Sequence, residues 1–380
     1  MMVMDTFEKV EILGRSAQYD LCGEACGTDA ARKKDDLGRW IYPAALPDGQ
    51  RVAMLKVLLS NTCQKDCHYC ANRASRDFRR VSFAPEELAR AFDQMHRKGL
   101  VKGLFLSSGI CGKAGRAMDQ MIATVELVRQ RYAFSGYVHL KILPGASFAH
   151  VERAVQLATR VSINLEAPNA ERLARIAPRK DFAANLLQPM HWAKSLIEAS
   201  GGRLVPAGQT TQFVVGAADE SDREILMTTA RLYRGMGLAR AYFSAFQPVV
   251  DTPLEGHPPT PPLREHRLYQ SDWLFRQYDF TFEDLIFDEA GNLPREADPK
   301  MMWAQVHRER FPIEVNRASR EELLRVPGLG PRSVARILRL RRQGTFRTLT
   351  DLKKIGAVAS RAAPFILLDG KRPPYQMSLW

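Results

Sequence analysis

The chain has 380 residues, and its length suggests two or three domains. Its 55 Lys and Arg against 42 Asp and Glu give a formal charge of +13, which favours an anionic partner such as nucleic acid. No run of about 18 apolar residues exists, so no membrane span is expected. Acidic residues occupy the place of a secretory signal, so we expect a cytoplasmic protein whose six cysteines are reduced.

Residues 1–50 are interpreted as an N-terminal extension that begins with a short amphipathic piece containing Val10 and Leu13. A loop rich in Gly, Asp and Lys follows, and it contains Cys22 and Cys26 at x3 spacing. Together with Cys111 these two cysteines could hold a second metal cluster. The favoured alternative is that all three are free thiols, because unligated cysteine behaves as a small hydrophobe.

Three cysteines, Cys63, Cys67 and Cys70, stand at C-x3-C-x2-C spacing after an apolar run that reads as a buried strand, 54–59. Three thiolates on one loop can hold three corners of a 4Fe–4S cluster and leave one iron open to a small molecule. Zinc is the alternative. A structural zinc site needs four ligands, typically in two pairs. Here the loop offers only His68 besides the three cysteines, so the sequence favours the 4Fe–4S cluster.

This loop resembles the signature of the radical S-adenosylmethionine (SAM) enzymes. The resemblance implies that Cys63, Cys67 and Cys70 bind the cluster, and that its open iron takes the amino and carboxylate groups of SAM. Tyr69 would place its backbone near the adenine. In that family a reduced cluster cleaves SAM to a 5′-deoxyadenosyl radical, which abstracts hydrogen from the substrate. An electron donor such as a flavodoxin or ferredoxin is implied as well.

Between residues 51 and 250, β-rich runs alternate with helical patterns. The expected strands are 53–59, 103–106, 137–142, 160–165, 212–215 and 240–246, and the expected helices are 85–99, 118–132, 149–158, 180–200 and 219–236. Alternation of this kind predicts βαβ units and a parallel sheet. The fold class is therefore α/β, and six units fit the partial (β/α)6 barrel of the radical SAM family.

Ligands of such folds bind at the carboxyl ends of the strands. Ser107, Ser108 and Gly109 follow the second strand where the family usually has Gly-Gly-Glu, and by resemblance they would take the amino group and methionine end of SAM. The missing Glu is a departure from the family. Asn164 and Glu166 are two apart, so a regular strand would present both on one face. The resemblance assigns them to the ribose hydroxyls and the SAM carboxylate.

The fifth strand resembles the adenine-binding strand of the family. Gly216 would allow a close backbone approach, and Gln212 would face the ribose or the carboxylate. His139 and Lys141 share a strand face and either meet an anionic substrate or are a satisfied histidine and a surface lysine. Cys111 is a candidate hydrogen donor for a repair cycle, with a buried thiol as the alternative.

Residues 251–312 change in composition. The run Pro258–Pro262 predicts a semi-rigid linker, because consecutive prolines exclude regular helix. Two aromatic-rich helical stretches follow, 263–278 and 298–308, and their aromatics are expected to pack as core. Residues 369–380 are interpreted as a tail.

Residues 313–368 contain a helix, a tight Gly-x-Gly turn and a second helix, with a weaker copy near 349–360. Backbone amides at a helix N-terminus suit a phosphate group. The pattern resembles the tandem helix-hairpin-helix (HhH) domain of non-sequence-specific DNA binders, although such domains also serve as docking modules. The positions that would meet the DNA backbone are Gly328, Gly330, Arg332, Ser333 and Arg336.

The combination of both halves, with the segments 104–109 and 206–212, resembles a radical SAM family described as putative DNA modification or repair proteins. Members are often encoded beside a protein of the uracil-DNA-glycosylase superfamily, which is therefore a possible partner by resemblance. The expected function is radical chemistry on a DNA nucleotide. An RNA-modifying enzyme and a non-catalytic, cluster-bearing scaffold are the alternatives.

Overall fold

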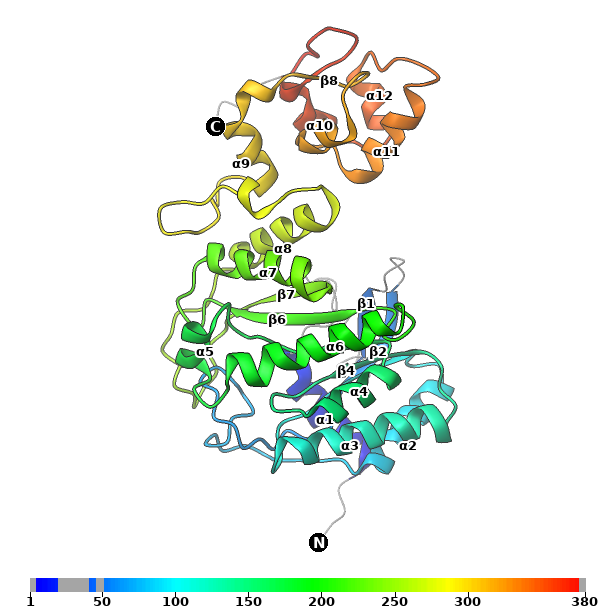
Figure 1. The fold of residues 1–380 in the computed structure, drawn as a ribbon, viewed down its shortest axis with the longest axis vertical. Helices are drawn as coiled ribbons and strands as arrows, with labels where there is room; N and C mark the ends of the chain where they lie inside the picture. Colours follow the sequence, from blue (N-terminus) through cyan, green and yellow to red (C-terminus); the bar gives the residue numbers. More distant parts are fainter. Residues whose placement is uncertain (1–4, 20–40, 46–50, 376–380) are drawn as a thin grey trace. The chain divides into compact units, whose positions relative to one another are not determined.

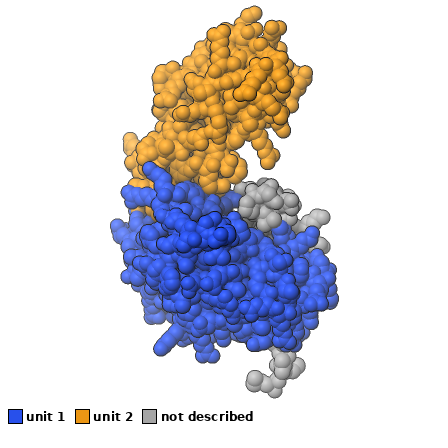
Figure 2. All heavy atoms as spheres, turned by 45° about the vertical axis from the view of Figure 1, so that its right-hand side comes forward, with its two compact units in different colours: residues 1–220, 231–265 blue, residues 221–230, 266–380 orange. Residues whose placement is uncertain are grey.

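A computed structural model describes residues 5–19, 41–45 and 51–375 of the chain (Figure 1). The contacts divide the chain into two compact units, coloured in Figure 2. Unit 1 comprises Met1–Glu220 and Arg231–Glu265, and unit 2 comprises Ser221–Ala230 and His266–Trp380. The stretch 251–312, interpreted as a linker and a helical segment, is divided between the two units. Cys22 and Cys26 lie outside the described residues.

Unit 1 is built on a seven-stranded sheet whose strands follow one another in chain order. The first strand, β1 (Ile41–Ala45), is antiparallel to β2 (Arg51–Leu58) and was not predicted from the sequence. The remaining neighbours are parallel: β2, β3 (Gly103–Ser107), β4 (Tyr137–Lys141), β5 (Arg160–Ser162), β6 (Gln209–Val215) and β7 (Leu238–Ala245). The predicted α/β fold, a six-stranded parallel half-barrel, is confirmed.

Helices cross over between the parallel strands, and α2, α3, α4 and α6 pack side by side in one layer (Figure 1). The helix α2 begins at Pro85, which needs no intrahelical partner for its nitrogen, and its first turn carries Glu86 and Glu87, as the sequence predicted. The helices of this unit are α1 (Thr6–Ser16), α2 (Pro85–Arg97), α3 (Ala114–Glu126), α4 (Phe148–Leu157), α5 (Ala170–Ile176), α6 (Gln188–Ala199) and α7 (Asp222–Met236), which extends into unit 2.

Two π-helical segments adjoin these helices, η3 (Leu127–Arg131) after α3 and η4 (Phe182–Leu187) before α6. The expected amphipathic piece near the N-terminus is α1, and Val10 and Leu13 on it are fully buried. Over the residues that the structure describes, no helix has both the length and the apolar character needed to cross a membrane.

Unit 2 contains most of α8 (Pro262–Gln277), together with α9 (Pro299–Val306) and two short helical hairpins. The first hairpin joins α10 (Arg320–Arg325) to α11 (Pro331–Leu340), and the second joins α12 (Leu349–Lys354) to α13 (Ala359–Ala362). A short parallel pair, β8 (Ile313–Glu314) and β9 (Ile366–Leu367), closes the domain. One apolar core unites the hairpins and includes Leu323, Ile337 and Leu352.

Candidate metal centre and nucleic-acid interface

The cysteine loop follows β2 and is bonded to the loop that follows β3. The Gly109 N–H donates to the Ser60 carbonyl at 2.7 Å, and the Gln64 N–H donates to the Ile110 carbonyl at 2.8 Å. A Cβ atom at Gly109 would overlap the Thr62 carbonyl oxygen, so only glycine fits there. The structure therefore brings the predicted Ser107–Gly109 segment directly beside the three cysteines, at the carboxyl edge of the sheet.

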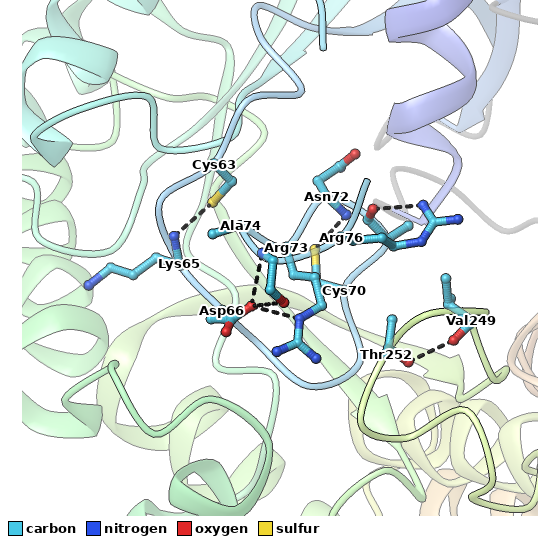
Figure 3. A network of polar contacts seen from close by, with 12 residues as sticks. Cys63, Lys65, Asp66, Cys70, Asn72, Arg73, Ala74, Arg76, Val249 and Thr252 are labelled. Atoms are coloured by element: carbon cyan, nitrogen blue, oxygen red, sulfur yellow. Dashed lines mark hydrogen bonds and ion pairs between the residues drawn. The ribbon is translucent and has the colours of Figure 1, made fainter. Parts of the chain in front are cut away.

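Asp66 fixes the shape of this loop (Figure 3). Its carboxylate accepts from Arg73 Nε at 2.6 Å and from the Ser75 hydroxyl at 2.9 Å, and the two side chains Asp66 and Arg73 point toward each other. The bond from Arg73 holds the pKa of Asp66 well below its usual range. The Ala74 N–H donates to the Lys65 carbonyl at 3.0 Å and closes the loop.

Arg80 is a second structural anchor that the sequence did not reveal. Its guanidinium donates to the carbonyls of Asn61 at 2.9 Å, Asn72 at 3.0 Å and Arg73 at 2.6 Å, and it lies 3.8 Å from the centre of the Phe78 ring. One side chain thus satisfies carbonyls on both sides of the cysteine segment. No spacing rule identifies such a residue.

The thiols lie in a setting suited to metal binding. The Lys65 N–H points to Cys63 Sγ and the Asn72 N–H to Cys70 Sγ, each at 3.4 Å (Figure 3). Burial raises the pKa of Cys67, and burial together with the neighbouring Cys67 raises the pKa of Cys70 to about 12. These thiols hold their protons at neutral pH until a metal displaces them.

Within the described residues, no three His, Cys, Asp or Glu side chains are grouped as ligands of a single metal ion. A 4Fe–4S cluster binds each thiolate at a different iron, so its ligands need not converge on one point, and the three-thiol set fits such a cluster. His68, the extra ligand considered for zinc, has Nδ1 2.9 Å from the Arg175 carbonyl oxygen.

Lys180 is a buried cation beside the cysteines, and sequence reasoning missed it. Its side chain is 8% exposed, and Nζ lies 3.3 Å from the Tyr69 hydroxyl and 3.6 Å from Glu166 Oε1. Burial lowers the pKa of Lys180, but the negative charges that Cys67 and then Glu166 carry when they are ionised outweigh it, so the pKa is raised. Burial, followed by the charge of Glu166, raises the pKa of Tyr69 well above its ordinary value.

Glu166 adopts a strained backbone conformation, with φ of 65°. The predicted strand 160–165 is shorter than expected, because β5 ends at Ser162. Ser162 pairs with Thr210, whereas Glu166 pairs with Phe213, so one extra residue separates the two pairings. A bulge re-aims a side chain at a strand end. Asn164 and Glu166 therefore do not lie on the regular strand that the sequence predicted, and the carboxylate of Glu166 lies beside Lys180.

Asn164 is 7% exposed and lies on the segment that ends at Glu166. Gln212 is 4% exposed and lies on β6, the strand that pairs with Glu166. Gly216 has a positive φ, but its backbone is already bonded: the N–H donates to Glu220, and the carbonyl lies 2.8 Å from His257 Nε2. A Cβ atom would overlap the Thr260 hydroxyl. Packing alone therefore requires this glycine, and its contact with adenine stays a prediction.

Cys111 is a partly exposed free thiol directly after Ile110, whose carbonyl is bonded to the cysteine loop. Cys111 therefore follows directly on a residue that is hydrogen-bonded to the cysteine loop. Its role as a hydrogen donor stays a prediction.

The first hairpin of unit 2 turns sharply at Gly328 and leaves backbone amides at the start of α11. Gly328 has φ of 84°, and its carbonyl accepts from the Val358 N–H of the second hairpin at 2.9 Å. A Cβ atom at Gly328 would overlap the Val358 carbonyl oxygen. Gly330 is the N-cap of α11, so the first amides of that helix have no partner within the helix.

The predicted interface residues of this hairpin divide into two groups. Arg332 is exposed at the start of α11. Ser333 is only 3% exposed, and its hydroxyl bonds both the N–H and the carbonyl of Gly330, so the side chain stabilises the turn and only its amide is left for a phosphate. Arg336 donates to the Ile355 carbonyl at 2.9 Å and links the two hairpins.

The family model of the radical SAM superfamily matches residues 57–231. The family model of the helix-hairpin-helix motif matches residues 310–362. Residues 57–231 form a radical SAM superfamily domain. Members of this superfamily use a 4Fe–4S cluster and SAM, and a helix-hairpin-helix motif is typical of nucleic-acid binding.

Similar solved structures include HydG, the FeFe-hydrogenase maturase from Carboxydothermus hydrogenoformans, at 15% identity, covering 57% of this chain and 49% of that chain, with a TM-score of 0.46. Methylornithine synthase (PylB) has 14% identity, covers 57% and 60%, and has a TM-score of 0.46. The radical SAM methyltransferase TsrM from Kitasatospora setae, with cobalamin and a [4Fe-4S] cluster bound, has 11% identity, covers 58% and 40%, and has a TM-score of 0.41. The chain thus spans 40–60% of the length of these three structures. No curated protein matches the chain.

Proposed function

We propose that the chain is a radical SAM enzyme that modifies or repairs a nucleotide of DNA. The observation that carries this proposal is the position of the three-cysteine loop at the carboxyl edge of the half-barrel, beside the buried group Lys180, Tyr69 and Glu166. A buried lysine next to three thiols is suited to an anionic, metal-bound cofactor rather than to a purely structural loop.

Each residue of this edge has a proposed task. Cys63, Cys67 and Cys70 would hold the cluster, which when bound supplies the electron that cleaves SAM reductively. Lys180 would pair with the SAM carboxylate, because it is a cation with a buried side chain that contacts Tyr69 of the cysteine loop. Tyr69 positions Lys180 by accepting its hydrogen bond. Asn164, Glu166, Gln212 and the Ser107–Gly109 segment would bind the remaining polar groups of SAM.

The helical hairpins would supply affinity for DNA without reading its sequence, because contacts to phosphates position a protein but do not specify bases. Arg332, Arg339 and Arg342 are exposed, and the sequence has no acid between Glu322 and Asp351. A base in a stacked duplex cannot reach a buried site, so the target nucleotide would be flipped or single-stranded. A flavodoxin or ferredoxin as electron donor, and a uracil-DNA-glycosylase-like partner, belong to the same proposal.

The test is anaerobic formation of 5′-deoxyadenosine from SAM by the reconstituted, reduced protein, with and without DNA. We expect product that increases with DNA and that disappears when all three cysteines are replaced by Ala. SAM cleavage that is indifferent to DNA would contradict the DNA substrate. An intact cluster without any SAM cleavage would contradict the enzymatic role.

A second measurement tests the DNA partner alone. The logarithm of the DNA association constant falls with the logarithm of salt concentration by about 0.9 per phosphate contact. Arg332→Gln should therefore reduce that slope by about one contact, whereas Arg372→Gln, exposed and outside the matched motif, should not. Structured RNA that binds as tightly as DNA in the same salt would favour the RNA alternative.

A further inference from the structure

One face of the half-barrel sheet carries a row of polar side chains that crosses its strands. The parallel registers pair Lys56 with Phe105, Phe105 with His139, and His139 with Arg160. Contacts place them on one face. The rings of Phe105 and His139 are 4.6 Å apart, Lys56 Nζ is 5.9 Å from the centre of the Phe105 ring, and Arg160 Nη1 donates to the Tyr242 hydroxyl at 3.3 Å. We call the four paired residues Lys56, Phe105, His139 and Arg160 the inner row.

The inner row is buried and positively charged. His139 is 1% exposed, Lys56 2% and Arg160 7%. Burial lowers the pKa of His139 well below its ordinary value, and the charges of Arg160, Lys141 and Lys56 lower it further. The imidazole is therefore neutral, with one N–H donor, and it lies in the field of three cations.

His139 and Thr210 on this face have buried polar atoms that lack a hydrogen-bond partner. Within the described part of the chain, neither ring nitrogen of His139 nor the Thr210 hydroxyl is bonded. Thr210 pairs with Ser162, two residues beyond Arg160 on β5, so it lies on the same face nearer the cysteine loop. A buried polar group left unpaired destabilises the folded state, because it has lost its hydrogen bonds to water. A ligand that supplies acceptors would satisfy the Thr210 hydroxyl and the single N–H of the neutral His139 ring.

We propose that the inner row, with Thr210, binds the phosphoryl group of a nucleotide. The His139 N–H and the Thr210 hydroxyl would donate to its oxygens, while Arg160 and Lys56 would balance its charge. A phosphate monoester carries up to two negative charges and three acceptor oxygens, which match two cations and two neutral donors better than a single carboxylate does. Beyond Ser162 the β5 segment continues through Asn164 to Glu166, so the bound nucleotide would lie toward the SAM end of the sheet. The inference rests on the proposed function, since it names the part of the nucleotide that the domain holds.

The test is calorimetric titration of the full, cluster-loaded protein with thymidine 5′-monophosphate, and with thymidine as the uncharged control. We expect binding of the monophosphate and at least about tenfold weaker binding of thymidine. Arg160→Gln and His139→Phe should each weaken monophosphate binding about 10–100-fold. Lys98→Met, exposed just after α2, should not change it.

Arg160→Lys guards against misfolding, because it keeps the positive charge and should bind the monophosphate more tightly than Arg160→Gln does. His139→Phe gives a second readout. It removes two unpaired nitrogens, so the protein should unfold at a higher temperature although it binds the ligand less well. Equal binding of thymidine and its monophosphate, or unchanged binding by Arg160→Gln and His139→Phe, would overturn the proposal.

Two further measurements separate the possible sources of the phosphate, and they separate phosphate binding from SAM cleavage. A single-stranded oligonucleotide that displaces the monophosphate identifies a DNA strand as the source, and failure to displace it identifies a free nucleotide. SAM cleavage is measured on the same samples. Protein that cleaves SAM but does not bind the monophosphate refutes only this inference, whereas protein that binds it without cleaving SAM refutes only the enzymatic role.

Discussion

Replacing Lys180 by methionine should destabilise unit 1 strongly. The Lys180 and Glu166 side chains are 8% and 9% exposed, so the substitution leaves a buried carboxylate without its cation. Removing one partner of a buried ion pair costs about 3–5 kcal/mol, which lowers the melting temperature by about 6–20 °C for a unit of this size. Because the pKa of Lys180 is raised above its ordinary 10.5, this stabilisation is present at neutral pH and is lost only as the pH rises through that raised value.

The chain provides a matched control. Lys194 and Glu198 have the same 3.6 Å separation, but their side chains are 31% and 63% exposed. Lys194→Met should therefore cost only about 0.5 kcal/mol, because solvent screens an exposed pair. The double substitution Lys180→Met with Glu166→Gln should recover part of the loss, since the uncompensated charge is gone.

Thermal unfolding followed by circular dichroism measures these differences, and equilibrium dialysis of SAM follows in parallel. We expect Lys180→Met to weaken SAM binding, whereas Lys194→Met should leave it unchanged. If Lys180→Met and Lys194→Met melt at the same temperature, the burial argument for this pair is refuted.

The remaining predictions concern the cysteine loop and unit 2. Asp66→Asn should lower iron affinity about 10–100-fold in a chelator competition, because it loosens the loop that carries the cysteines. Asp77→Asn, at an exposed position, should leave iron affinity unchanged. Equal iron retention by the two variants would contradict the role of Asp66. Gly328→Ala should cost at least about 1–3 kcal/mol in urea unfolding and weaken DNA binding, because its φ is positive and its methyl would overlap a carbonyl, while Gly344→Ala, with open space, should do neither. Burial lowers the pKa of Lys300 from 10.5 to about 7, so the native state binds fewer protons than the unfolded chain between these values, and the free energy of unfolding of unit 2 should rise with pH across that window. Lys300→Met should abolish this rise, and a pH dependence that survives the substitution would refute the assignment.

Local patterns in the sequence predicted the sheet and singled out the cysteine loop, because strand periodicity and C-x3-C-x2-C spacing depend on neighbouring residues. Lys180 was not predictable in this way. It meets Tyr69 across 111 residues, and in the sequence it reads only as the start of a helix. The bulge before Glu166 was missed for a similar reason, since an extra residue is defined only by pairing with β6.

The HhH hairpins illustrate the other limit of sequence reasoning. The Gly-x-Gly turn correctly located the first hairpin, but residue type alone did not separate groups that bind the chain itself from groups left for a ligand. Ser333 and Arg336 both suit phosphate contact by chemistry, yet their side chains are bonded to the carbonyls of Gly330 and Ile355. Arg332 has the same chemistry and is exposed.

The hydrogen bonds of Arg80 have a consequence for the order of assembly. Its guanidinium holds the carbonyls of Asn61, Asn72 and Arg73 from within the protein, without help from a bound metal. The chain entropy of ordering this segment, about 1–2 kcal/mol per residue, is therefore lost during folding rather than during cofactor insertion. An incoming cluster meets ligands on a loop that is already shaped, so more of its binding free energy appears as affinity.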